Sequence, residues 1–485
     1  MLTPVLVQGR AMMAPMAARM PVVLDRRSDI TLDAFRRVAW CGEGVELSGA
    51  ALARIGEARW AFMALLDDPS IVIYGVTSGY GDRASVRLDP EERLAQARLG
   101  AGNIRISFDD PLPDRIVRGI VLARLASMLE GNAAVRPEIA EAVASMLDRD
   151  SLPAVPARGN GGAGEIIALG HLFGGLAELE LEEKESVALV NGSPASAALV
   201  ADAALAARGR LRLTEEMLAL SVEALRAPLE AYAPELEELW GDPHEAVALR
   251  RLRELLAGGA EDRRAYQAPV SYRILPRVLG QAHRALADAE RAATVSLSEV
   301  SDNPIFVPPS DSSPTGRILS NGSYHNARAP VALDGLAGAW ADLCQLAERH
   351  THRLRVDPDG LAEPDLPPSP VTYLQMVQVA YTEEARSHAQ RTALPAGGFD
   401  QDDVVSTGFL AWGKEGRAAG CLEALLATLG ATASEALHVS GRPAPPALAG
   451  LLAEVREHVP LEHEDVYGDG LARLASAFGA RVVSP

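Results

Sequence analysis

Several features that decide the class of a protein are scarce in this sequence of 485 residues. Cysteine occurs only three times, at Cys41, Cys344 and Cys421, which lie far apart and form no CxxC motif. A disulfide scaffold needs an even, closely spaced set of cysteines and a cysteine-rich zinc site needs pairs, so neither is expected. This usage fits a reducing compartment, and the expected location is the cytoplasm.

Positive charge is also in deficit, because 46 Lys and Arg residues face 65 Asp and Glu residues, a net charge of −19. Nucleic acids and anionic membranes are bound through dense positive charge, so neither is an expected partner. No run approaches the roughly 18 uncharged apolar residues that span a bilayer. The first residues contain Arg10 and Arg19 but no basic segment before an apolar core, which predicts a frayed terminus over residues 1–25 rather than a targeting peptide.

Strand-like segments are few. Ser70–Val76 (SIVIYGV) is the strongest, and a parallel sheet would need several such segments alternating with helices. Apolar residues instead recur at three- and four-residue spacing, which predicts amphipathic helices and a mostly α-helical fold with a long bundle. The predicted helices are Asp114–Asp148 with a break near Gly131, Ser193–Ala207, Thr214–Ala227, Val270–Val295, Val331–Arg353, Val371–Gln390 and Ser406–Ser440.

Four long segments rich in proline and glycine separate these helices: Ser151–Gly164, Phe306–Ser323, Val356–Ser369 and Leu394–Asp403. Loops of this length in a helical protein are more often functional than idle. The first of them ends in GNGGAG, which satisfies the GxGxxG pattern of dinucleotide-binding loops. That pattern requires a buried strand directly upstream. Two prolines stand there instead, so a dinucleotide site is not expected, and the glycines indicate only a tight turn.

Six short segments along residues 70–410 resemble, in the same order, the motifs of the histidine and phenylalanine ammonia-lyase family of aromatic amino acid lyases. Each one alone is a weak signal, but together they identify the chain as a divergent member. The segments are Tyr74-Gly75-Val76-Thr77-Ser78-Gly79-Tyr80-Gly81 (family YGxNTGFG), Val190-Asn191-Gly192 (LxNGT), Gln267-Ala268-Pro269-Val270-Ser271-Tyr272-Arg273 (QDxYSxR), Ser301-Asp302-Asn303-Pro304 (SDNP), Asn321-Gly322-Ser323-Tyr324-His325 (GGNFH) and Gln401-Asp402-Asp403-Val404-Val405-Ser406 (QEDHVS).

The resemblance implies an ammonia-lyase/fumarase-like architecture. It implies an N-terminal lyase-like domain over residues 26–205 that carries the pocket loops, followed by a long helical bundle over residues 206–485. Proteins of this family are homotetramers whose pockets collect loops from three subunits, so a homotetramer is expected here. The implied partner is a small amino-acid or betaine substrate.

The family builds its own electrophile, because an Ala-Ser-Gly tripeptide cyclises to a methylidene-imidazolone whose methylene comes from the serine. The corresponding segment here, Pro156–His171, contains no serine in either possible alignment. The missing serine therefore predicts a chain without this prosthetic group, and no other cofactor is expected. No metal is expected either, because His171, His325 and His388 lack the spacing of metal ligands. The motif tyrosine is also replaced by Val270, and the motif histidine by Val404.

Eight residues occupy positions that the family uses in its pocket. The predicted catalytic residues are Tyr74, Arg273 and Asn303, and the predicted substrate-binding residues are Asn191, Tyr324, Gln401, Asp402 and Tyr80. Tyr74 is either a general base or a buried tyrosine whose hydroxyl is satisfied. Arg273 either grips a substrate carboxylate or pairs internally with Asp302. The asparagines are alternatively ordinary caps, and Asp402 is alternatively a helix cap or a group that holds a cationic amine.

These residues favour an elimination that does not use the methylidene-imidazolone. A quaternary ammonium leaves as a neutral amine, and ergothionase-type relatives, which eliminate trimethylamine from a histidine-derived betaine, imply that this scaffold can work so. The predicted function is removal of an amine from an amino-acid or betaine substrate. The alternative is a non-eliminating homologue, either an isomerase or cyclase in biosynthesis or a binding or regulatory pseudoenzyme.

Overall fold

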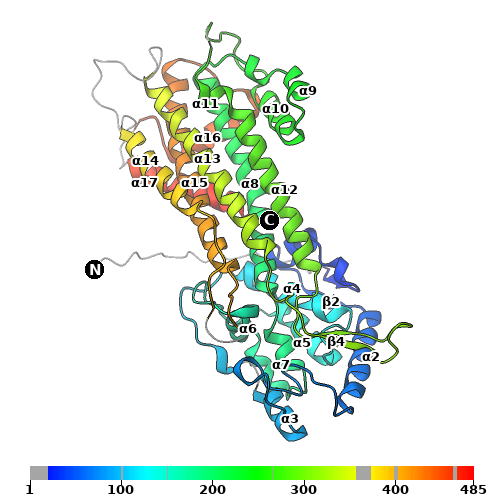
Figure 1. The fold of residues 1–485 in the computed structure, drawn as a ribbon. Coiled ribbons are helices and arrows are strands. Elements are labelled where there is room, and N and C mark those ends of the chain that lie inside the picture. The colour runs from blue at the N-terminus through cyan, green and yellow to red at the C-terminus, as the bar shows by residue number, and fades with distance from the viewer. Residues whose placement is uncertain are drawn as a thin grey trace, which may run out of the picture.

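Long helices determine the shape of this computed structural model, which describes residues 20–99, 102–149, 151–265, 267–356, 373–397, 402–462 and 467–484 (Figure 1). The helices of the N-terminal part are α1 (Leu32–Phe35), α2 (Gly49–Leu66), α3 (Pro90–Leu99), α4 (Asp114–Leu129), α5 (Pro137–Ser145), α6 (Ile166–Phe173) and α7 (Glu185–Val190). Those of the bundle and its cover are α8 (Pro194–Ala224), α9 (Glu235–Trp240), α10 (Pro243–Leu256), α11 (Val270–Arg273), α12 (Leu275–Ser298), α13 (Arg328–Val356), α14 (Leu374–His388), α15 (Gly408–Val439), α16 (Ala449–His458) and α17 (Tyr467–Val482). The mostly α-helical fold predicted from the sequence is confirmed.

Helix α8 forms the axis of the bundle and packs against α12, α13 and α15. Most of its residues are buried, as expected of the central helix of a bundle, while Arg208 and Arg212 are exposed. The sequence predicted two helices here because Arg208–Arg212 is polar. One helix runs through because the guanidinium of Arg210 is buried against Glu423 of α15, with Nη2 3.0 Å from Oε1. The division proposed at residues 205 and 206 falls inside this helix.

The stretch Glu185–Ala224 corrects a second expectation, since it is long and apolar enough to cross a membrane by composition. Its most apolar window is 89% buried inside the protein. The core of the bundle therefore accounts for its apolar character.

The N-terminal part packs around α4, and the break predicted near Gly131 is present between α4 and α5. Strand β1 (Val22–Leu24) pairs in parallel with β2 (Val45–Leu47) and buries Val22 and Leu24. The prediction of a frayed segment over residues 1–25 is therefore wrong for Val22–Leu24, and residues 1–19 lie outside the described residues. A second strand pair, β3 (Ile305–Val307) and β4 (Arg317–Leu319), forms a hairpin within the predicted loop Phe306–Ser323.

The strand predicted at Ser70–Val76 is wrong, because these residues form consecutive turns. The carbonyl of Ile73 accepts hydrogen bonds from the amides of Val76 and Thr77, and its own amide donates to the Thr77 hydroxyl at 2.7 Å. The side chains of Ile73 and Val76 are still buried, in a small cluster with Phe62 and Phe306. The apolar run thus anchors a turn, and the residue at its centre is Tyr74.

Candidate active site

A cavity of about 240 Å³ lies in the N-terminal part, between α7, the Gly-rich loop before α6 and the loops at residues 74–81, 303–324 and 402. It brings together six of the eight residues predicted from the sequence. Its lining consists of Tyr74, Tyr80, Gly81, Ile104, Ala163, Ile166, Ser186, Val187, Val190, Asn191, Asn303, Ser320, Asn321, Tyr324 and Asp402. Within the part of the chain that the structure describes, this lining includes no lysine or arginine.

The phenol of Tyr74 is held by its own loop, because the Gly81 amide donates to Tyr74 Oη at 3.0 Å. Burial raises the pKa of Tyr74, and the nearby Asp402, Tyr324 and Tyr80 raise it further, whereas the Gly81 hydrogen bond lowers it. A phenolate base needs a lowered pKa. Within one chain Tyr74 is therefore a neutral phenol at physiological pH, and the positive charge that would favour its ionisation has to come from elsewhere.

Two of the three asparagines that line the cavity, Asn191 and Asn303, were predicted from the sequence. Asn191 follows the last residue of α7, and its Oδ1 is buried with no hydrogen-bond partner among the described residues. Asn303 uses its Oδ1 to accept the Asn321 amide at 2.9 Å, which agrees in part with the cap interpretation. A buried amide oxygen without a partner is unfavourable in a resting protein, so Asn191 is suited to accept a hydrogen bond from a ligand.

An acidic group and two aromatic groups also line the cavity. Burial raises the pKa of Asp402, and the neighbouring Asp82 and Asp403 raise it further. The rings of Tyr80 and Tyr324 line the same cavity. A carboxylate and aromatic faces together suit a cationic ammonium group. Gln401, the remaining predicted substrate-binding residue, lies outside the described residues.

The Gly-rich loop approaches the cavity closely at Gly164, where φ is +69°. A Cβ at this position would lie 3.3 Å from Asn191 Oδ1, so a side chain would press on the pocket. No strand precedes the loop; the Pro156 region forms only an isolated bridge with Pro111. Dinucleotide-binding loops of this pattern follow a buried strand, which the described residues 151–158 do not form.

The loop also tests whether the prosthetic group of the resembled family fits. Ala163 and Ile166 face the cavity, and no residue of 159–165 carries a hydroxyl that could become an exocyclic methylene. The residues present do not fit the group. Among the described residues, no three His, Cys, Asp or Glu side chains are placed to share a metal ion.

Sequence reasoning missed Glu165, which is fully buried and anchors this loop. Its carboxylate accepts hydrogen bonds from the amides of Ala195 and Ser196 at the start of α8, and from the Ser196 hydroxyl. Burial raises the pKa of Glu165 to about 7, and these hydrogen bonds oppose the shift. An acid between a Gly-rich turn and the first residue of α6 gave no signal of this contact in the sequence.

Arg273 does not reach the cavity in one chain. It is the last residue of α11, which lies at the opposite end of the molecule from α6 and α7 (Figure 1). Its Nε donates to the Ala268 carbonyl at 2.9 Å. The alternative pairing with Asp302 is wrong, because Asp302 binds Lys184. A carboxylate grip by Arg273 therefore requires a second copy of the chain.

Comparisons with known proteins agree on one family. The sequence profile of the aromatic amino acid lyases matches residues 30–177 and 174–457. Histidine ammonia-lyase of Deinococcus radiodurans is 33% identical over 366 residues, which cover 69% of this chain and 68% of that enzyme. Histidine ammonia-lyase of Streptomyces avermitilis is 29% identical over 439 residues, 81% of this chain and 83% of that enzyme.

Two solved structures share the fold over nearly the whole chain. Tyrosine aminomutase from Streptomyces globisporus has a TM-score of 0.82 at 23% identity, covering 96% of this chain and 98% of that one. Ergothionase from Treponema denticola, in complex with desmethyl-ergothioneine sulfonic acid, has a TM-score of 0.87 at 18% identity, covering 96% and 99%. At such identities the likeness concerns the fold alone.

Proposed function

This chain belongs to the aromatic amino acid lyase family, and from that premise we propose that it eliminates an amine from an amino-acid or betaine substrate without a methylidene-imidazolone. The observation that carries the proposal is the composition of the cavity. It combines a tyrosine at the family position of the base, an acidic and aromatic side, and a Gly-rich loop without a serine.

The leaving group follows from the missing electrophile. Expulsion of a primary amine from an amino acid is difficult without one, whereas a quaternary ammonium departs as a neutral amine. Asp402 with Tyr80 and Tyr324 offers a carboxylate and ring faces to such a cation. The ergothionase fold likeness fits a betaine, and the histidine ammonia-lyase relatives fit an α-amino acid.

Tyr74 is the proposed base, and the substrate itself supplies the charge that the phenol lacks. A permanently cationic group bound beside Asp402 offsets the acid and lowers the pKa of Tyr74. The phenolate then accepts a proton from the carbon next to the one that bears the amine, and that electron pair forms the double bond as the amine leaves. Asn191 and Asn303 hold polar groups of the substrate.

Arg273 is proposed to bind the substrate carboxylate from a second copy within a homotetramer. Exposed apolar side chains on the bundle helices, among them Val331, Met376 and Leu410, provide a surface on which copies can associate. Because the described lining of the cavity contains no arginine or lysine, a basic group from such a copy would give an anionic substrate group its charged partner.

One observation favours a second candidate, a homologue that binds an amino-acid-like ligand without eliminating from it. Neutral Tyr74 is a better hydrogen-bond donor than base, as its raised pKa requires. In this alternative the cavity holds its ligand through Asn191, Asn303 and Asp402, and no bond to nitrogen breaks.

The deciding experiment incubates the protein with matched pairs of aromatic α-amino acids and their N-trimethyl betaines and follows acrylate absorbance. We expect turnover of a betaine and little or none of its parent amino acid. Intact mass of the same sample should match the encoded chain. A deficit of two water molecules within residues 159–164 would disprove the absence of the prosthetic group, and binding of a betaine without turnover would favour the second candidate.

A further inference from the structure

The chain contains only two lysines among its 46 basic residues, Lys184 and Lys414. Lys414 lies on α15 and forms an ion pair with Asp334 at 3.5 Å. Lys184 precedes α7 and is completely buried, with Nζ 2.6 Å from Oδ2 of Asp302, whose side chain is also 0% exposed. A fully buried pair of this kind is expensive to form, so a lysine retained there in an arginine-rich chain needs a reason.

The Lys184–Asp302 pair joins two walls of the cavity. We define the α7 wall as Ser186, Val187, Val190 and Asn191, and the turn wall as Asn303, Ser320, Asn321 and Tyr324. Lys184 is the N-cap residue of α7 and lies two residues before Ser186, the first residue of the α7 wall. Asp302 stands directly before the second.

Asp302 accepts hydrogen bonds from several residues in and around the turn wall. Its Oδ1 accepts the Asn303 amide at 2.8 Å while Oδ2 accepts Lys184. Its carbonyl accepts hydrogen bonds from Asn321 Nδ2 at 3.2 Å and from the Ser323 hydroxyl at 2.8 Å. The pair therefore fixes Asn303 and Asn321, both of which face the cavity.

The far end of the α7 wall is tied to the same turn. The Ser193 amide donates to Ser301 Oγ at 3.1 Å. Between them, Gly192 has φ +134°, and a Cβ there would lie 2.1 Å from the Ser301 carbonyl. Arg124, which is fully buried, donates to the Asn191 carbonyl from behind. Residues 184–193 are thus held against residues 301–302 at both ends.

We propose that Lys184 and Asp302 are positioning residues that set the separation of the α7 wall and the turn wall, and thereby place Asn191 and Asn303 for the substrate. A lysine suits this position better than an arginine, because the guanidinium of an arginine usually binds both oxygens of a carboxylate. The ammonium of Lys184 binds only Oδ2 of Asp302, so Oδ1 is left to accept the Asn303 amide. This inference rests on the proposed function for its kinetic consequence, but not for its structural one.

The test uses a double variant, Lys184→Met with Asp302→Asn, because Lys184→Met alone would leave a buried carboxylate without a partner and endanger folding. The control is Lys414→Met, which removes the only other lysine and leaves the cavity untouched. Hydrogen–deuterium exchange should rise at residues 186–193 and 303–324 in the double variant only. On whichever betaine the wild type turns over, KM should rise about tenfold and kcat should change less than about threefold, since the amides bind ground and transition state alike.

Unchanged exchange in both segments together with a wild-type KM would overturn the proposal. Exchange that rises throughout the chain would also overturn it, because it would show a general stabilising role. If the wild type turns over no substrate, the proposed elimination fails, and the exchange measurement alone still decides whether the pair holds the two walls together.

Discussion

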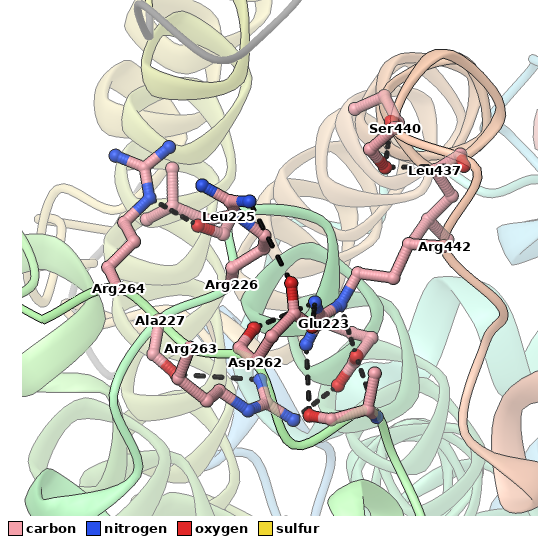
Figure 2. A network of polar contacts seen from close by, with 12 residues as sticks. Glu223, Leu225, Arg226, Ala227, Asp262, Arg263, Arg264, Leu437, Ser440 and Arg442 are labelled. Atoms are coloured by element: carbon pink, nitrogen blue, oxygen red, sulfur yellow. Dashed lines mark hydrogen bonds and ion pairs between the residues drawn. The ribbon is translucent and has the colours of Figure 1, made fainter.

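The two ends of this molecule each contain a buried ionic network, and the two networks are satisfied to different degrees. At the far end of the bundle, Glu223 of α8 binds Arg442 through Oε1 and Arg263 through Oε2 (Figure 2). Arg442 also donates hydrogen bonds to the carbonyls of Ala260 and Asp262. No side-chain atom of these residues is left buried without a hydrogen-bond partner in the described part of the chain.

The network at the cavity is incomplete by comparison. Asn191 Oδ1 and Arg124 Nε are both buried, and neither has a hydrogen-bond partner in the described ranges of the chain. Both atoms lie on residues that α7 or α4 place at the cavity or directly behind it. Unpaired buried atoms also occur in the bundle, on Thr351, Gln378 and Thr382 among others, so an unpaired atom alone does not mark a ligand site. Asn191 Oδ1 is suited to a ligand because its residue also lines the cavity. The Glu223 network therefore stabilises the fold, whereas the amide oxygen of Asn191 at the cavity stays available to bind a ligand.

Loss of the Tyr74 hydroxyl should have the largest effect on activity and should act at the cavity end alone. Tyr74→Phe removes only the oxygen that accepts a hydrogen bond from Gly81 and is the proposed proton acceptor. We expect kcat on a betaine substrate to fall about 10²–10⁴-fold, the usual loss for a general base, with substrate affinity and melting temperature nearly unchanged. Steady-state kinetics and calorimetric binding measure both. Full activity of the variant would refute the base assignment and leave the fold assignment standing.

Removal of Glu223 should affect the other end alone. Glu223→Gln leaves the guanidinium groups of Arg442 and Arg263 without their buried counter-charge, a change that typically costs about 3–5 kcal/mol of unfolding free energy. Urea unfolding measures this loss, and the exposed pair Arg291–Asp288 offers a control in Asp288→Asn, which should cost less than about 1 kcal/mol. Equal losses in the two variants would contradict the assigned role of the far network.

The sequence predicted the helical fold and six residues of the cavity because apolar periodicity and short motifs are local properties. Ser70–Val76 misled because an apolar run has the same appearance whether it buries its side chains from a strand or from turns. Arg208–Arg212 misled because the partner of Arg210 lies on α15, more than two hundred residues away. Glu165 and Lys184 were missed for the same reason, since their roles arise from contacts with α8 and with Asp302. The role of Arg273 remains a prediction, because its position in one chain leaves it far from the cavity.

The burial of Glu165 makes the stability of the cavity end depend on pH. Its pKa is raised from the model-compound value of 4.5 to about 7 in the folded protein. The stabilising contribution of the protonated acid is therefore fully present below about pH 4.5 and is lost as pH rises through about 7, a total of about 3 kcal/mol. Urea unfolding at pH 5 and pH 8 should show a larger decrease for the wild type than for Glu165→Gln. Equal decreases would mean that Glu165 is ionised in the folded protein over this range.

Arg273→Ala as a single variant should give the smallest of these effects on activity. Combined with Tyr74→Phe in mixed oligomers, it should show which copy supplies Arg273. A charged hydrogen bond to a substrate carboxylate contributes about 1.5–3 kcal/mol, so KM should rise about 10–100-fold, while unfolding changes little because Nε donates only to the local Ala268 carbonyl. If Arg273 acts in the cavity of another copy, a mixed oligomer of the Arg273→Ala and Tyr74→Phe variants contains some intact pockets. Each of these takes Tyr74 from one variant and Arg273 from the other. Random pairing makes about a quarter of the pockets complete in a symmetric oligomer. Co-expression of two differently tagged variants, purified through both tags, measures the recovery, and each variant mixed with itself is the control. No recovery in a mixed oligomer would place Arg273 outside the reaction, and a monomer in light scattering at micromolar concentration would exclude the shared pocket altogether.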